Sequence, residues 1–160
     1  MQYIQYDPTN TFHKSIVGAV AEGHKFGIRL QLNQCVAPSN VFLVVYSDDG
    51  EFNQEYQMYR EQGSGGWDSY LCDIALNKGL YWYYFRMEGV RYEHYIGIDA
   101  NNKPSLYYDN VQPWQLSVYK KAYKVPEWLN QGVMYQIMPD RFYGDGTTTA
   151  TDDKILRPWG

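Results

Sequence analysis

The sequence lacks the features that mark several large classes of protein. It contains no block of lysine or arginine, and its formal net charge is −4. Binding to nucleic-acid phosphates through a basic patch is therefore excluded as a main activity. No apolar run approaches the roughly 20 residues of a membrane-spanning helix, and the first residues do not resemble a signal peptide. We expect neither a nucleic-acid partner nor a membrane partner.

Cysteine is also scarce. The two cysteines, Cys35 and Cys72, fit neither a CxxC motif nor any metal-ligand spacing. We expect two reduced thiols in the core of the protein, and the alternative is one disulfide across a sandwich. Together with the absence of a signal-like start, these cysteines favour a cytoplasmic location over secretion.

Helical periodicity is missing before Val125, because no segment there spaces its apolar residues by three and four. Aromatic residues are abundant instead: they make up 18% of the chain, with 17 Tyr and 5 Trp. Aromatic side chains are favoured in strands, and their flat faces also suit the apolar surfaces of sugar rings. The composition therefore indicates a β-rich protein and leaves open whether some rings bind a ligand.

Alternation of apolar and polar residues locates the strands. In KFGIRLQL the apolar side chains fall on every second residue, which is typical of a half-buried strand; they are Phe26, Ile28, Leu30 and Leu32. Further strands are expected at 41–46, 55–61, 67–76, 80–89, 91–99 and 113–119. The turn Asn77-Lys78-Gly79 predicts a hairpin between 67–76 and 80–89, and 91–99 is expected to pair back across Gly89.

These strands predict the fold class of residues 1–125. About seven short strands separated by turns indicate an all-β, immunoglobulin-like antiparallel β-sandwich. An SH3-like or OB barrel is the alternative, although it normally uses fewer strands. The polar segment 120–128, with a proline after Val125, is expected to end this domain.

Residues 126–160 have a different pattern. The run 132–138 is almost continuously apolar and lacks clean alternation, which is typical of a strand buried on both faces in a parallel sheet or barrel. The chain supplies no helices to cover such a strand. We therefore interpret 126–160 as a linker, the first strand and a loop of a second, truncated domain, which the family resemblance of the next stretch implies is a (β/α)₈ barrel.

The stretch 125–146, VPEWLNQGVMYQIMPDRFYGDG, resembles the start of the catalytic barrel in the α-amylase superfamily of glycoside hydrolases. The residues that carry the resemblance are Tyr135, Gln136, Ile137, Asp140, Arg141 and Phe142. Upstream, residues 113–128 are similar to the junction between sandwich and barrel in the pullulanase, neopullulanase and cyclomaltodextrinase branches. The earlier strands resemble the family's N-terminal domain more loosely.

This resemblance implies an α-glucan-active enzyme that retains the anomeric configuration with two closely spaced carboxylates. In the family the catalytic Asp, Glu and Asp follow later barrel strands, so the resemblance implies no catalytic residue in 1–160. It assigns Asp140 and Arg141 to fixing a loop rather than to catalysis, and Tyr135 to packing. The alternative for the whole protein is a non-catalytic sugar-binding or adhesion module.

Some members of the family bind calcium in the loop after this strand. Asp145, Asp152 and Asp153 are the weak candidates here, because a hard cation prefers oxygen ligands. The Asn expected in such a site is absent, however, and the loop up to Trp159 resembles the calcium-free version. We therefore expect no metal or other cofactor.

Exposed aromatic rings of the sandwich are the candidates for contact with an α-glucan. They are Trp67, after a glycine-rich segment, and Trp82 together with Tyr81 or Tyr83. The same rings could instead pack against the protein's own catalytic barrel or against a second subunit in a homodimer, as the family's N-terminal domains often do.

Overall fold

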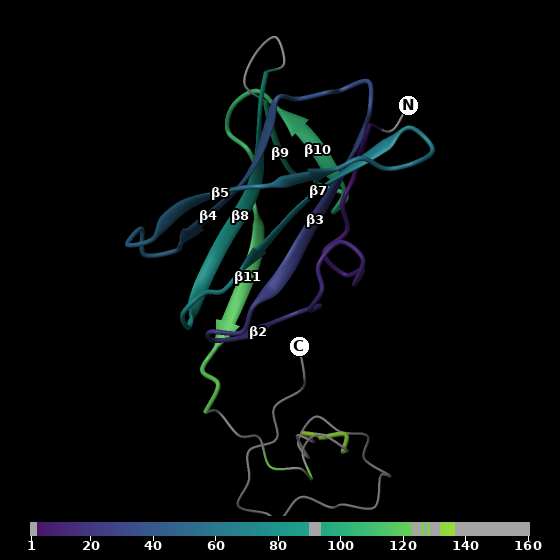
Figure 1. The fold of residues 1–160 in the computed structure, drawn as a ribbon. Helices are drawn as coiled ribbons and strands as arrows, with labels where there is room; N and C mark the ends of the chain where they lie inside the picture. The colour runs from purple at the N-terminus through teal and green to yellow at the C-terminus, as the bar shows by residue number, and fades with distance from the viewer. Residues whose placement is uncertain (1–2, 90–93, 123–125, 127, 129–131, 137–160) are drawn as a thin grey trace, which may run out of the picture. The chain divides into compact units, whose positions relative to one another are not determined.

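The computed structural model describes residues 3–89, 94–122, 126, 128 and 132–136 of the chain (Figure 1). The chain divides into two compact units, Met1–Tyr123 and Lys124–Gly160. Within the described residues, the first unit consists of β-strands joined by turns and contains no α-helix. The predicted all-β sandwich is therefore confirmed. No helix in the described part of the chain is long and apolar enough to cross a membrane.

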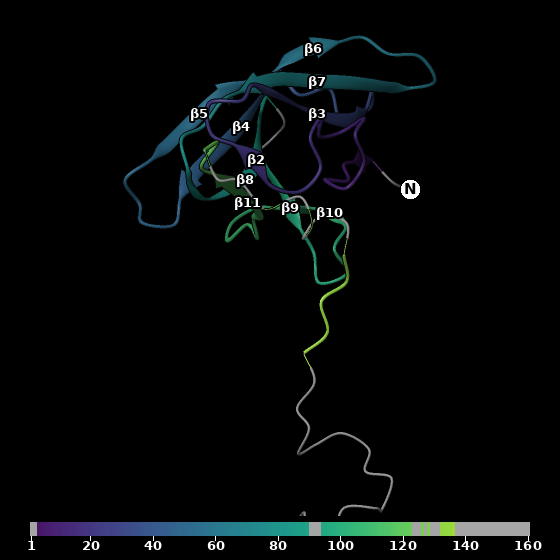
Figure 2. The ribbon, with the colours of Figure 1, turned by 90° about the horizontal axis from the view of Figure 1, so that it is seen from below.

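Two sheets form the layers of the sandwich, which Figure 2 shows edge-on. Sheet A has the order β1 (Ile4–Gln5), β3 (Phe26–Asn33), β7 (Trp67–Ile74) and β6 (Tyr59–Glu61). Sheet B contains β2 (Val20–Ala21), β4 (Asn40–Ser47), β5 (Asn53–Gln57), β8 (Gly79–Glu88), β9 (His94–Ile98), β10 (Pro104–Tyr107) and β11 (Trp114–Tyr119). The described pairs are antiparallel except β11 with β2, which is parallel.

Strand β8 is the centre of sheet B, because it pairs with three other strands. Along one edge it pairs with β4 from Tyr81 to Glu88. Along the other edge, β11 pairs with its first half and β9 with Phe85, Arg86 and Met87. Strands β9 and β11 therefore follow one another along a single edge of β8. The predicted pairing of 91–99 back onto 80–89 is confirmed.

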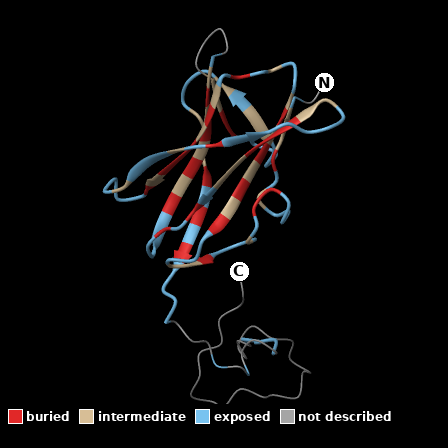
Figure 3. Cartoon of the chain, viewed as in Figure 1, coloured by how far each residue is buried: buried red, intermediate tan, exposed pale blue. Residues whose placement is uncertain are grey.

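The core lies between the sheets and is built by strict alternation, which Figure 3 shows as stripes along β3, β8 and β11. The four predicted inward residues of β3 are each at most 2% exposed. On β8 the inward residues include Tyr83 and Phe85, both 0% exposed. The Tyr83 hydroxyl shares a hydrogen bond of 2.8 Å with the Tyr6 hydroxyl, so this polar group in the core has a partner.

The predicted hairpin between 67–76 and 80–89 is wrong. Strand β7 belongs to sheet A, where it pairs with β3 and β6, whereas β8 lies in sheet B. The link between them crosses from one sheet to the other. Leu76, 5% exposed, lies in the core within this link. A tight hairpin turn would leave the Leu76 side chain at the surface, so its burial favours the crossing between sheets.

The single strand expected at 55–61 is two strands. Strand β5 pairs with β4 in sheet B, and β6 pairs with β7 in sheet A. Between them Met58 is 5% exposed and donates its backbone N–H to the carbonyl of Val41 at 2.8 Å. The chain therefore changes sheets at Met58, where burial of one apolar side chain fixes the crossing point.

The cysteines differ from the predicted pair of core thiols. Both are free, so the alternative of a disulfide does not apply, and Cys35 is exposed. Cys72 is partly buried against the core. Burial, with a smaller effect of the Asp73 carboxylate, raises the pKa of the Cys72 thiol to about 12.

The second unit is described only in part. Residues 132–136 form no strand, and Val133, Met134 and Tyr135 are 77%, 74% and 81% exposed. The predicted barrel strand is therefore not formed over these five residues. The remainder of that strand lies outside the described residues, and the division into domains at 125 and 126 stays a prediction.

The two thiols should react at very different rates. Cys35 is exposed and accessible to a reagent, whereas Cys72 stays almost fully protonated at about pH 8 because burial raises its pKa. Ellman's reagent should therefore modify one thiol quickly in the native protein and the second only in denaturant. The Cys35→Ser variant should lose the fast phase. Equal fast rates for both thiols would contradict this placement of Cys72.

Candidate functional site

Five partly exposed aromatic residues of β4, β8 and β9 lie on the outward side of sheet B, away from the core. We call them the aromatic face: Phe42, Tyr46, Trp82, Tyr84 and Tyr95. They come from three neighbouring strands, because β4 and β9 both pair with β8. Alternation positions them: the inward residues of β8 fill the core, so the residues between them point outward.

The rings of the aromatic face contact one another. Tyr84 meets Tyr46 with ring centroids 6.3 Å apart and Tyr95 with centroids 5.8 Å apart, both edge to face, the arrangement that aromatic quadrupoles favour. Val44 lies on this outward side, in register with Tyr84, yet it is only 3% exposed. The outward side chains therefore form a packed layer of their own, and the rings are held in place before any ligand arrives.

Trp82 is fixed by a hydrogen bond as well as by packing. Its indole Nε1 donates to Asp48 Oδ1 at 2.9 Å. In the register of the sheet it lies between Tyr46 on β4 and Gln115 on β11. Burial, followed by the Asp48 carboxylate, raises the pKa of Tyr46. The indole thus presents a ring of defined orientation beside a carboxylate.

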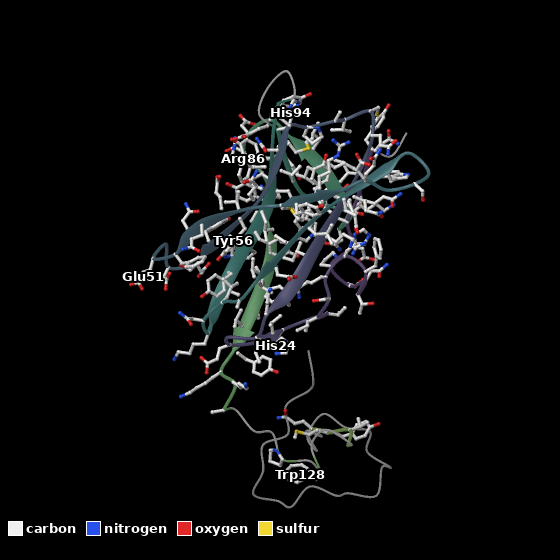
Figure 4. All side chains as sticks on the ribbon, in the orientation of Figure 1. His24, Glu51, Tyr56, Arg86, His94 and Trp128 are labelled. Carbon is white, nitrogen blue, oxygen red and sulfur yellow. The ribbon has the colours of Figure 1, made fainter. Side chains whose placement is uncertain are left out.

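Arg86, which Figure 4 labels, lies opposite Phe42 on β4 and Tyr95 on β9, at the end of the aromatic face away from Trp82. Its guanidinium carbon lies 4.4 Å from the centroid of the Phe42 ring. The same group pairs with Glu55 and with Glu88 at 2.6 Å each, and its side chain is 14% exposed. The hydrogen bond to Glu55 is the main cause that raises the pKa of Arg86. The guanidinium therefore links β4, β5 and β8 on the outward side of the sheet.

The structure separates the predicted sugar-binding residues. Trp82 belongs to the aromatic face. Tyr81 is 5% exposed and packs against Phe52 on the inward side of β8, so it does not belong to the aromatic face, and its contact with a sugar stays a prediction. Trp67 is partly exposed but stands at the start of β7 in sheet A. The structure therefore does not bring Trp67 and Trp82 to one site.

Four members of the aromatic face were not predicted from the sequence: Phe42, Tyr46, Tyr84 and Tyr95. The segment 41–46 was predicted as a strand because it is continuously apolar, and no outward side was assigned to it. The sequence did contain a usable signal: the aromatic residues Phe42 and Tyr46 fall on the other side of the strand from positions 41, 43 and 45, which face the core. Which rings meet across strands, however, depends on the pairing of β4, β8 and β9, which no local pattern specifies.

Most of the predicted family motif lies outside the residues that the structure describes. Asp140, Arg141 and Phe142 lie outside the described residues, as do the calcium candidates Asp145, Asp152 and Asp153. Tyr135 and Gln136 are exposed. In the part of the chain that the structure describes, no group of three His, Cys, Asp or Glu side chains could hold a metal ion.

Loss of Arg86 should loosen the outward layer. We expect Arg86→Ala to lower the free energy of unfolding by about 1–3 kcal/mol, because the charge-assisted hydrogen bonds to Glu55 and Glu88 and the stack on Phe42 disappear. Arg86→Lys should recover only part of this loss, since lysine lacks the planar fork. Urea unfolding followed by tryptophan fluorescence measures the effect.

The matched control is Lys25→Ala, which removes only an exposed ion pair with Asp73. This change should cost less than about 1 kcal/mol. If Arg86→Ala lowered the free energy of unfolding no more than Lys25→Ala does, the guanidinium would not stabilise the outward layer.

Comparison with known proteins connects this sandwich to glycoside hydrolases. No protein-family model matches the chain. The amylopullulanase of Thermoanaerobacterium thermosulfurigenes is 26% identical over 159 residues, which cover 96% of this chain and 8% of that protein. The amylopullulanase of Thermoanaerobacter thermohydrosulfuricus is 27% identical over 162 residues, covering 90% of this chain and 10% of that protein. The chain thus spans about a tenth of the length of these curated relatives.

A solved structure of similar fold is a cyclomaltodextrinase, with a TM-score of 0.57 and 13% identity. The similarity covers 99% of this chain and 26% of the cyclomaltodextrinase. This likeness shows that the two chains share a fold. The similarity to the amylopullulanases confirms the resemblance to the pullulanase branch of glycoside hydrolases that the sequence showed.

Proposed function

We propose that this chain is the sandwich region of an α-glucan-active glycoside hydrolase and that its aromatic face binds the glucan. The observation that carries the proposal is a preformed layer of partly exposed rings with fixed polar neighbours on one side of sheet B. Similarity to amylopullulanases over nearly the whole chain supports the choice of glucan over other ligands.

The chemistry of the aromatic face suits a sugar. The C–H surface of a glucose ring stacks on an aromatic face, and its hydroxyl groups need hydrogen-bonding partners at the ring edge. Trp82 and Tyr84 supply rings on one strand, while Asp48 and the exposed Gln115 stand beside Trp82. These neutral and acidic groups suit hydroxyls better than they suit an anionic ligand.

Cleavage of the glycosidic bond is assigned to another part of such an enzyme. A retaining mechanism needs a carboxylate pair about 5 Å apart, and the resemblance implies that this pair comes from later barrel strands. In this proposal residues 1–160 hold the substrate and have no hydrolytic activity by themselves. Whether the enzyme cuts α-1,4 or α-1,6 bonds is a property of that other part.

A protein–protein role is the second candidate, and exposed apolar side chains favour it. Leu80 and Tyr119, on the neighbouring strands β8 and β11, are 37% and 48% exposed. Apolar side chains of this kind gather at interfaces between subunits. In this candidate function, the outward side of sheet B would pack on the enzyme's own barrel or on a second copy of the chain.

Titration with linear maltooligosaccharides tests glucan binding. We expect maltohexaose to change the tryptophan fluorescence, because Trp82 would stack on the sugar, and Trp82→Ala to weaken binding at least about tenfold. Isothermal titration calorimetry measures the affinity independently of the fluorescence. Trp67→Ala is the matched control, since Trp67 lies in sheet A and should leave the affinity unchanged.

The opposite results would overturn glucan binding. Equal affinity of the Trp82→Ala variant would remove the aromatic face from the site. No binding of maltohexaose at millimolar concentration, together with dimers of the wild-type chain in sedimentation analysis that Leu80→Glu dissociates, would establish the protein–protein role instead.

A further inference from the structure

A pocket of about 480 Å³ lies at the end of sheet B where β8 begins. It is formed between the β4–β5 loop, residues 48–52, and the end of the β7–β8 link at 77–78, together with the first residues of β8. Its lining includes Asp48, Glu51, Phe52, Lys78, Leu80 and Tyr81. Figure 4 labels Glu51 on the β4–β5 loop. A volume of this size is in the range of small-molecule sites, and no function considered so far uses it.

Hydrogen bonds hold the walls of this pocket in place. Gly50, at φ +75°, lets the β4–β5 loop turn back, and Ser47 Oγ accepts the backbone N–H of Phe52 at 2.9 Å. The backbone N–H of Asp48 donates to the carbonyl of Leu80 at 3.0 Å, which ties the loop to β8. The Tyr81 hydroxyl donates to the carbonyl of Asn77 at 3.1 Å. A ligand would therefore meet a preorganised site.

The side chains of the pocket suit a neutral molecule with many hydroxyl groups. Phe52 and Tyr81 give it apolar rings, with centroids 5.5 Å apart. Asp48 and Glu51 supply carboxylate acceptors, and Lys78 supplies an ammonium donor. Asp49 also lines the pocket, so three carboxylates stand against one ammonium group and disfavour an anionic ligand. The described residues also offer no cluster of three ligands for a metal.

The pocket is continuous with the aromatic face. Asp48 belongs to both, because it lines the pocket and also accepts the hydrogen bond from the Trp82 indole. Leu80 in the pocket and Trp82 on the face are two residues apart on the outward side of β8, a separation of about 7 Å along a strand. A chain lying on Trp82 and Tyr84 can therefore extend into the pocket.

We propose that this pocket receives the terminal glucose residue of an α-glucan chain whose neighbouring residues stack on Trp82 and Tyr84. The proposal rests on glucan binding at the aromatic face and adds a preference for chain ends. Glu51 and Lys78 form hydrogen bonds with the hydroxyl groups of the terminal glucose residue, while Leu80 and Tyr81 contact its apolar surface.

Maltohexaose and α-cyclodextrin test this preference, because both contain six glucose residues and only the linear sugar has ends. Calorimetric titration of the full chain should give an affinity at least about fivefold higher for maltohexaose. The double variant Glu51→Gln, Lys78→Ala should lower the affinity for maltohexaose to that for α-cyclodextrin and leave α-cyclodextrin unchanged. Trp82→Ala should weaken both sugars, and the control Lys25→Ala should weaken neither.

Failure of this inference differs from failure of the proposed function. If both sugars bind with equal affinity, or if the double variant weakens both equally, the chain-end pocket is refuted while glucan binding stands. If neither sugar binds the wild-type chain, both proposals fall together. Circular dichroism of each variant shows that a loss of affinity is not a loss of fold.

Discussion

The pairing of β8 with three other strands is the constraint on which the sandwich and its outward surface both depend. The register with β4, β9 and β11 decides which residues of β8 face the core. Since side chains alternate along a strand, a slip of one residue would exchange the two faces. Tyr83 and Phe85 would then leave the core, and Trp82 and Tyr84 would enter it. Stability of the fold and orientation of the aromatic face are therefore fixed by the same hydrogen bonds.

The inward side of β8 explains why this register is so well determined. Tyr83 stacks on Trp114, with ring centroids 5.7 Å apart, and Tyr6 meets Phe85 and Trp114 edge to face. Burial is the main cause that raises the pKa of both Tyr6 and Tyr83, so the pair stays neutral and shares its hydrogen bond. The shapes of these rings and their one hydrogen bond favour a single packing arrangement in the core. That arrangement fixes the register of β8, and the register fixes the positions of the outward rings.

Local patterns in the sequence predicted much of this arrangement but not its long-range pairing. Alternation located β3 and β11 together with their inward residues, because the period of two is a property of each strand alone. It did not show that β7 and β8 belong to different sheets, because that depends on burial of Leu76 in the link. It also assigned Tyr81 to the surface, since a strand in which both faces are aromatic does not reveal which side is inward. The rings that meet across β4, β8 and β9 needed the register itself.

The spacing of strands suggests how a ligand would lie on this surface. Neighbouring strands are only about 4.8 Å apart, so outward rings on adjacent strands contact one another, as Tyr84 does with Tyr46 and Tyr95. Successive outward residues of one strand are about 7 Å apart, which leaves each ring face more accessible in that direction. On the β11 side the neighbours of β8 are Gln115 and Ser117, which are small or polar. A flat ligand is therefore accommodated along β8 rather than across the sheet, and the ends of β8 decide where it stops.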